Sequence, residues 1–175
     1  NVLRSFSIHD YGSVSFLVLA SIEEIFKFGA AYLIIRHRPE FDEPIDAMVY
    51  LITAAMGFAT AENLAVNSGL LSDFVSRDVA AASLILGDAF TITTRRFIGA
   101  TLLHSLSSGL IGYYWALGIK RQKIGRYLLT GLIIGIILHA IFNYFIIRDI
   151  SVVYPSIFLT VVAFFLLKDF EKLKV

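Results

Sequence analysis

Apolar stretches about as long as a membrane is thick constrain the fold of this chain more than any other feature. A bilayer core of ~30 Å is crossed by about 20 apolar residues in a helix. Such stretches lie at residues 13–35, 45–69, 97–119 and 127–147, and a shorter one, nearly free of charge, lies at residues 150–167. We therefore expect about five transmembrane helices.

A further apolar stretch, residues 79–93, carries Asp88 and leads directly into Arg95 and Arg96. We interpret it as an extra helix that lies in the interface or bends into the third span. The sequence contains no repeat and no soluble domain. It predicts an all-α polytopic membrane protein, a bundle of about five transmembrane helices plus one lead-in or interfacial helix, in a single membrane-embedded domain over residues 1–175.

Composition supports this class and excludes others. Hydrophobic residues make up 57% of the 175 residues and charged residues only 17%, whereas soluble domains are usually about 45–50% apolar and about 25% charged. The chain has no cysteine, which excludes disulfides and thiolate chemistry. No basic cluster with interleaved aromatic residues is present, so we expect no nucleic-acid partner. The lipid bilayer is the first partner that the sequence predicts.

Basic residues in the short loops predict an orientation. Those that gather after the first span, after the third span and in the tail are Arg36, Arg38, Lys120, Arg121, Lys123, Arg126, Lys168, Lys172 and Lys174. With five alternating spans these segments lie on one side, which the positive-inside rule assigns to the cytoplasm. We expect a multi-pass protein of the cell membrane, with its first residue extracytoplasmic and its C-terminus cytoplasmic.

Polar side chains inside four spans are the strongest functional signal. An ionisable group there costs about 2.5–3.5 kcal/mol even on insertion scales and usually faces a cavity or a partner. The residues concerned, with their helical neighbours, are Glu23, Glu24 and Lys27 in the first span, Phe58, Glu62 and Asn63 in the second, His104 and Ser108 in the third, and His139 and Asn143 in the fourth. The carboxylates and imidazoles lie roughly 10–15 Å below one surface, and i,i+4 spacing places each set on one helix face. We therefore expect a single site in the bundle core.

These residue types suit peptide hydrolysis, which needs a base for water and donors for the oxyanion. Either Glu23 or Glu24 would activate water, and His104, His139 and Asn143 would stabilise the oxyanion. Histidine and glutamate are also good zinc ligands. Because the His-Glu-x-x-His motif is absent, zinc or another divalent metal held by His104, His139 and one of the paired glutamates is the weaker option, and no cofactor is assigned.

Five motifs in this order resemble those of the PrsW family of membrane proteases. They are Glu23-Glu24-x-x-Lys27, Asp42-Glu43-Pro44-x-Asp46, Gly57-Phe58-Ala59-x-x-Glu62-Asn63, His104-x-x-x-Ser108 and His139-x-x-x-Asn143. The family is similar, more distantly, to CAAX prenyl endopeptidases and to a scaffold subunit of gamma-secretase.

The resemblance implies cleavage of single-span membrane proteins near the extracytoplasmic side, with an anti-sigma factor as the best-known type of substrate. It also implies that Glu23 and Glu24 are the paired catalytic glutamates and that His104 and His139 are the motif histidines. Family members usually carry helices before the paired glutamates, whereas here the first span follows closely on Asn1.

Two other functions fit the same polar residues. A non-catalytic scaffold would use them to hold the transmembrane helix of a partner, and a proton-coupled transporter would use them as a relay. The absence of broken helices in paired halves of the sequence disfavours a transporter. Purely structural interpretations also remain, with Glu23 and Lys27 as a neutralised pair and His139 with Asn143 as an interhelical hydrogen-bonding pair. The oligomeric state is not predicted.

Overall fold

The computed structural model describes residues 13–75, 79–148, 151 and 153–173, and within these it describes the backbone but not the side chains of residues 13, 66–75, 79–98 and 147. The part of the chain so described forms helices and no strand. The helices are α2 (Ser13–Ile35), α3 (Asp46–Val75), α4 (Val79–Lys120), α5 (Ile124–Ile147) and α6 (Val153–Leu173). The predicted all-α class is confirmed.

Three of these helices are long and apolar enough to cross a membrane by length and composition, namely Asp46–Ala65 within α3, Ile124–Ile146 within α5, and α6. Helix α2 has 23 residues, and its mostly apolar sequence carries three ionisable groups, Glu23, Glu24 and Lys27. Its outer face exposes large apolar side chains, with Phe26 70% and Leu33 67% exposed. Lipid accommodates such a surface and water does not, so the predicted polytopic membrane fold is confirmed.

Helix α4 differs from the prediction for residues 79–93. It runs without a break from Val79 to Lys120 over 42 residues, or about 63 Å at 1.5 Å per residue. The stretch at 79–93 is therefore the first part of the helix that forms the third span, and not a separate interfacial helix. No proline falls in this segment to interrupt the backbone hydrogen bonds, so the helix continues through Arg95 and Arg96.

Other helix ends also differ from the predicted spans. Helix α3 continues to Val75, α5 begins at Ile124, and α6 ends at Leu173. The start predicted at residue 150 lies outside the described residues. The differences have one cause, since hydropathy marks only the apolar part of a helix, whereas backbone hydrogen bonding continues into polar turns.

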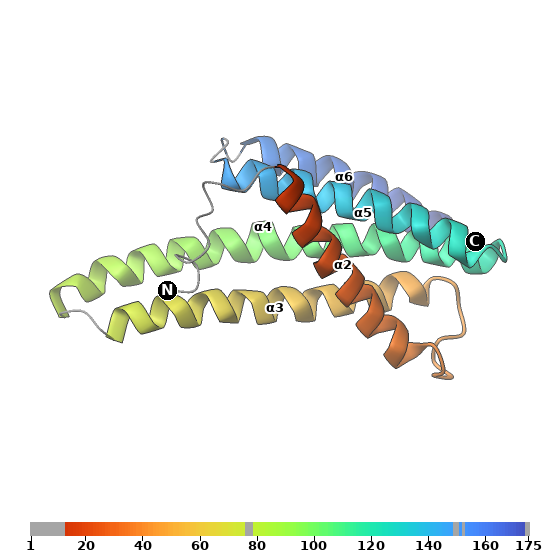
Figure 1. Cartoon of the computed structure of the whole chain (residues 1–175), viewed down its shortest axis with the longest axis horizontal. Helices are drawn as coiled ribbons and strands as arrows, with labels where there is room; N and C mark the ends of the chain where they lie inside the picture. Colours follow the sequence, from red (N-terminus) through yellow and green to blue (C-terminus); the bar gives the residue numbers. More distant parts are fainter. Residues whose placement is uncertain (1–12, 76–78, 149–150, 152, 174–175) are drawn as a thin grey trace.

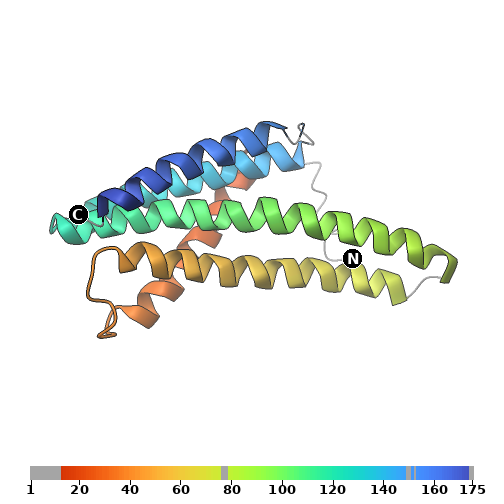
Figure 2. The ribbon, with the colours of Figure 1, turned by 180° about the vertical axis from the view of Figure 1, so that it is seen from behind.

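Helix α4 lies in the centre of the bundle. Figures 1 and 2 show α3 along one side of α4 and α5 with α6 along the other, while α2 crosses this layer obliquely on one face. Glycines permit the close approach of these helices. A Cβ on Gly112 would lie 2.6 Å from the Met48 Cα of α3, and a Cβ on Gly135 would lie 2.7 Å from a side-chain carbon of Ile111. The central helix thus holds both neighbours at close range.

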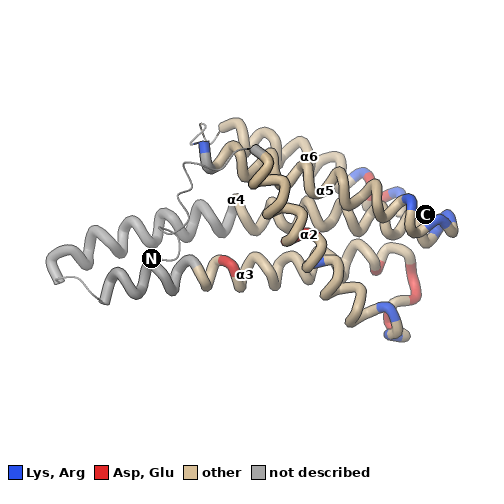
Figure 3. Tube along the Cα trace, viewed as in Figure 1, with Lys and Arg blue, Asp and Glu red and all other residues tan. Residues whose placement is uncertain are grey.

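Charged side chains gather at one end of the bundle. Figure 3 shows lysines, arginines and acidic residues at the end where the α2–α3 loop, the α4–α5 turn and the C-terminus meet. The middle of the described helices is mostly uncharged. The three basic segments of the sequence therefore lie on the same side of the molecule.

Candidate active site

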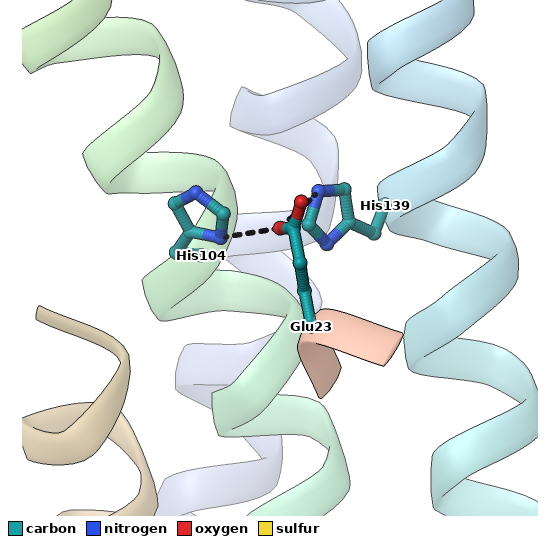
Figure 4. Close-up of side chains that lie close together, drawn as sticks. All are labelled: Glu23, His104 and His139. Atoms are coloured by element: carbon teal, nitrogen blue, oxygen red, sulfur yellow. Dashed lines mark ion pairs between the residues drawn. The ribbon is translucent and has the colours of Figure 1, made fainter. Parts of the chain in front are cut away.

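Side chains from α2, α4 and α5 meet inside the bundle. Figure 4 shows Glu23 pointing between the rings of His104 and His139. Its Oε2 lies 3.4 Å from His139 Nε2 and 4.0 Å from His104 Nδ1. The two imidazole rings meet edge to face with their centroids 5.0 Å apart. Residues that are up to 116 positions apart in the chain thus form one cluster.

Glu24, the neighbour of Glu23, is fully buried and fully hydrogen-bonded. Its Oε1 accepts from Lys27 Nζ at 2.6 Å, Ser107 Oγ at 2.7 Å and His139 Nδ1 at 2.7 Å. Its Oε2 accepts from Ser108 Oγ at 2.9 Å. Four donors from three helices leave this carboxylate little capacity to act on a water molecule or to hold a metal. Glu24 instead fixes the positions of the groups around it.

His139 is oriented by this contact. A carboxylate can only accept hydrogen bonds, so the proton of the His139 ring lies on Nδ1, which faces Glu24. The other ring nitrogen, Nε2, lies 3.4 Å from Glu23 Oε2, and a ring with a single proton on Nδ1 carries its lone pair there. A carboxylate that holds one ring nitrogen of a histidine while the other faces the site is the usual support of a metal-binding histidine.

His104 has a partner at each ring nitrogen. Lys27 Nζ lies 3.0 Å from its Nδ1, and Glu62 Oε2 lies 2.9 Å from its Nε2. An ammonium can only donate, so Nδ1 accepts and the proton lies on Nε2, where it is donated to Glu62. Phe58 covers this arrangement, because its ring lies against the His104 ring and beneath the Lys27 ammonium, with both separations 5.3 Å.

Glu23 is the carboxylate that remains available. Its Oε2 is buried and has no hydrogen-bond partner among the described residues, although its side chain is 24% exposed. The i,i+4 spacing suggested that Lys27 would pair with Glu23, but Lys27 pairs with Glu24 at i,i+3. The structure therefore distinguishes two glutamates that are equivalent in the sequence.

The other predicted residues divide into two groups. Ser108 joins the cluster through Glu24, and Glu62 joins it through His104. Asn143 is half-buried one turn beyond His139, and in the described part of the chain it makes no hydrogen bond to the cluster. Asn63 donates to Thr101 Oγ1 at 3.4 Å, and its buried Oδ1 has no partner among the residues described.

Ser107 is a cluster residue that the sequence did not single out as functional. Its hydroxyl donates to Glu24 from the turn that follows His104. The signal was its i,i+3 spacing from His104, which places both side chains on one face of α4. A serine in a membrane helix is more often a small packing residue, and so this spacing alone was weak.

A divalent metal fits the cluster. Glu23, His104 and His139 each offer one ligand atom, and these atoms lie within 4.8 Å of one another. The buried Oε2 of Glu23 lacks a hydrogen-bond partner among the described residues, and Nε2 of His139 faces it. Three protein ligands with one position left for water are typical of catalytic zinc sites. The oxygens of Glu24 are occupied, so Glu23 is the glutamate of this ligand set.

The fold and the cluster define a class, a polytopic helical membrane protein that gathers glutamates and histidines from three helices inside the bundle. Within that class, the sequence profile of the PrsW family intramembrane metalloproteases matches residues 4–168. The chain belongs to this family, which confirms the resemblance carried by its motifs.

A curated relative agrees with this assignment. Protease PrsW of Geobacillus kaustophilus (strain HTA426) is 28% identical over 133 residues, which cover 74% of this chain and 50% of the relative. The chain thus spans about half the length of that protein. No solved structure matches the chain.

Proposed function

We propose that the chain is an intramembrane peptidase that cleaves single-span membrane proteins near their extracytoplasmic side. An anti-sigma-factor-like protein is the type of substrate we propose. The observation that carries the proposal is the buried, unpartnered Oε2 of Glu23 between His104 and His139. Membership in a family described as intramembrane metalloproteases supports it.

In this proposal the two glutamates have different roles. Glu23 acts at the reaction centre, as a ligand of the metal when one is bound, or, if cleavage proceeds without metal, as the base that takes a proton from water and returns it to the leaving amine. Glu24 is a positioning residue that orients His139 and Lys27 through hydrogen bonds of 2.7 and 2.6 Å. A His139 ring with its single proton on Nδ1 offers a lone pair at Nε2, so it would stabilise an oxyanion only after gaining a second proton. Asn143 stays a proposed oxyanion donor.

The charge of the cluster supports a divalent metal. Glu23, Glu24 and Glu62 carry three negative charges when ionised, and Lys27 supplies one positive charge. Two negative charges inside an apolar bundle are costly, and a divalent cation held by Glu23, His104 and His139 would balance them. When bound, such a metal supplies a Lewis acid and an activated water.

We expect complete removal of metal to abolish cleavage. The assay co-expresses the chain with candidate single-span membrane proteins and then follows the product in isolated membranes, with and without a chelator. Zinc added back should restore cleavage, and the product length should place the cut near the extracytoplasmic end. Full cleavage by protein that metal analysis shows to be metal-free would instead leave Glu23 to activate water as a base. An intact candidate that co-purifies without any product would favour a scaffold.

We also propose that the charged end in Figure 3 is cytoplasmic, as the positive-inside rule predicts. Because the chain has no cysteine, single cysteines can report the side of each loop. Glu40 is exposed in the loop between α2 and α3, and Ser151 is exposed in the loop between α5 and α6. These two loops lie at opposite ends of the bundle (Figure 1). In intact cells a membrane-impermeant maleimide should label Ser151→Cys but label Glu40→Cys only after lysis. The reverse pattern would overturn this orientation.

A further inference from the structure

Lys27 occupies an unusual position for a lysine in a membrane protein. It is 2% exposed and lies in the middle of α2. Its ammonium donates to Glu24 Oε1 at 2.6 Å and to His104 Nδ1 at 3.0 Å, and it lies 5.3 Å from the centre of the Phe58 ring. The function proposed above assigns no chemistry to this ammonium, although it touches a member of the proposed metal ligand set.

The contact between Lys27 and His104 restricts how His104 can bind a metal. If Nδ1 is the ligand atom, the metal needs the lone pair that now accepts the hydrogen bond from Lys27. If Nε2 is the ligand atom, that nitrogen must lose its proton, and a neutral ring then carries the proton on Nδ1. Nδ1 would then be a donor facing an ammonium, which can only donate. Either nitrogen requires the contact to break.

We propose that Lys27 and a divalent metal compete for His104, so that Lys27 is a built-in competitor that lowers the metal affinity of the site. This inference rests on the metal site proposed above. Before metal binds, the ammonium neutralises Glu24 and holds His104 in place. When metal binds, Lys27 gives up His104 and keeps its hydrogen bond to Glu24.

The charges act in the same direction as the hydrogen bond. Lys27 reduces the negative charge of a cluster that holds Glu23, Glu24 and Glu62. At short range inside an apolar bundle, an ammonium beside a metal ligand disfavours a second cation. Lys27 therefore has two effects. It keeps the site ordered when no metal is bound, and it lowers the affinity of the site for metal.

The test compares zinc affinity in the full chain, purified in detergent, by competition with a chromophoric chelator. Lys27→Met keeps a side chain of similar length and removes the charge. We expect zinc to bind this variant about tenfold to hundredfold more tightly than the parent, from the usual strength of a hydrogen bond to a charged group. Lys172→Met is the matched control, since it also removes a lysine from an i,i+3 pair, but one that is 66% exposed in the last turn of α6. Its affinity should equal that of the parent.

An unchanged or weaker affinity in folded Lys27→Met would overturn the inference. Lys27→Gln is the second neutral variant if Lys27→Met does not fold, and it is expected to change the affinity in the same direction. In the unmodified protein, saturation with zinc should also shift the nitrogen NMR signal of the Lys27 ammonium, and an unmoved signal would contradict competition.

The same series separates this inference from the metal site itself. Zinc binding by the parent that is lost in His139→Gln, together with an unchanged affinity in Lys27→Met, would refute only the role of Lys27. No zinc binding by the parent would refute both the metal site and the competition. Because the readout is zinc affinity, neither outcome depends on whether a substrate is cleaved.

Discussion

Glu23→Gln should abolish cleavage of a co-expressed single-span membrane protein while the protein stays folded. The Oε2 atom of Glu23 has no hydrogen-bond partner in the described part of the structure, so the substitution breaks no hydrogen bond of this oxygen there and removes only its longer contacts to the two histidines. An amide cannot take a proton from water and is a poor metal ligand. We expect a loss of about 10²- to 10⁴-fold in rate, the usual contribution of a general base.

The measurement is the initial rate of product formation in membranes that contain equal amounts of folded parent and variant protein. Glu40→Gln is the matched control, because it makes the same chemical change in the exposed α2–α3 loop and should cleave at the parent rate. If Glu23→Gln cleaves at the parent rate, Glu23 does not act at the reaction centre, and the proposed division between the two glutamates fails.

The sequence predicted that these side chains would meet because depth can be counted along a helix. A rise of 1.5 Å per residue placed Glu23, His104 and His139 at one level, and the structure brings Glu23 within ion-pair range of both histidines. The helical periodicity also placed Ser108 on the face of His104, where it reaches Glu24. Depth and periodicity are local properties, and so a single sequence carries them.

The sequence could not distinguish the roles of Glu23 and Glu24. Adjacent residues differ by about 100° around a helix, and which of them enters the core depends on the angle at which α2 crosses α4 and α5. That angle is set by packing between helices, where ridges and grooves allow several solutions. The partner of Lys27 was missed for the same reason, since i,i+3 and i,i+4 pairing to the two glutamates are equally good locally.

The length of α4 shows a different limit. Hydropathy marks which residues prefer lipid, and it suggested a boundary near Arg95 and Arg96 because two consecutive charged residues lie there. Helix formation depends on backbone hydrogen bonds, which arginine supports well. Asn143 shows another limit of the sequence. Its i,i+4 spacing from His139 places it on the same helix face, but this spacing does not show whether a hydrogen-bond partner lies within reach.

Glu24→Gln should destabilise the protein strongly, unlike Glu23→Gln. Glu24 is the buried partner of Lys27, and removing one member of a buried ion pair usually costs about 3–5 kcal/mol because the other charge is left uncompensated. The amide also has only one oxygen to accept from Lys27, Ser107, Ser108 and His139. We expect a lower midpoint in reversible denaturant unfolding in micelles, with cleavage lost through misplacement of His139.

Two further variants test whether the loss of stability in Glu24→Gln comes from the unpaired charge of Lys27. Ser108→Ala removes one neutral donor from the same carboxylate and should cost only about 0.5–1.5 kcal/mol. The double variant Glu24→Gln with Lys27→Met leaves no buried charge from this pair, so it should be more stable than Glu24→Gln alone, a coupling that a double-mutant cycle measures. A Glu24→Gln variant that is as stable as the parent and yet inactive would instead make Glu24 the reactive carboxylate. The four hydrogen bonds to Glu24 would then hold it in a resting state, and some of them would have to break before it could act.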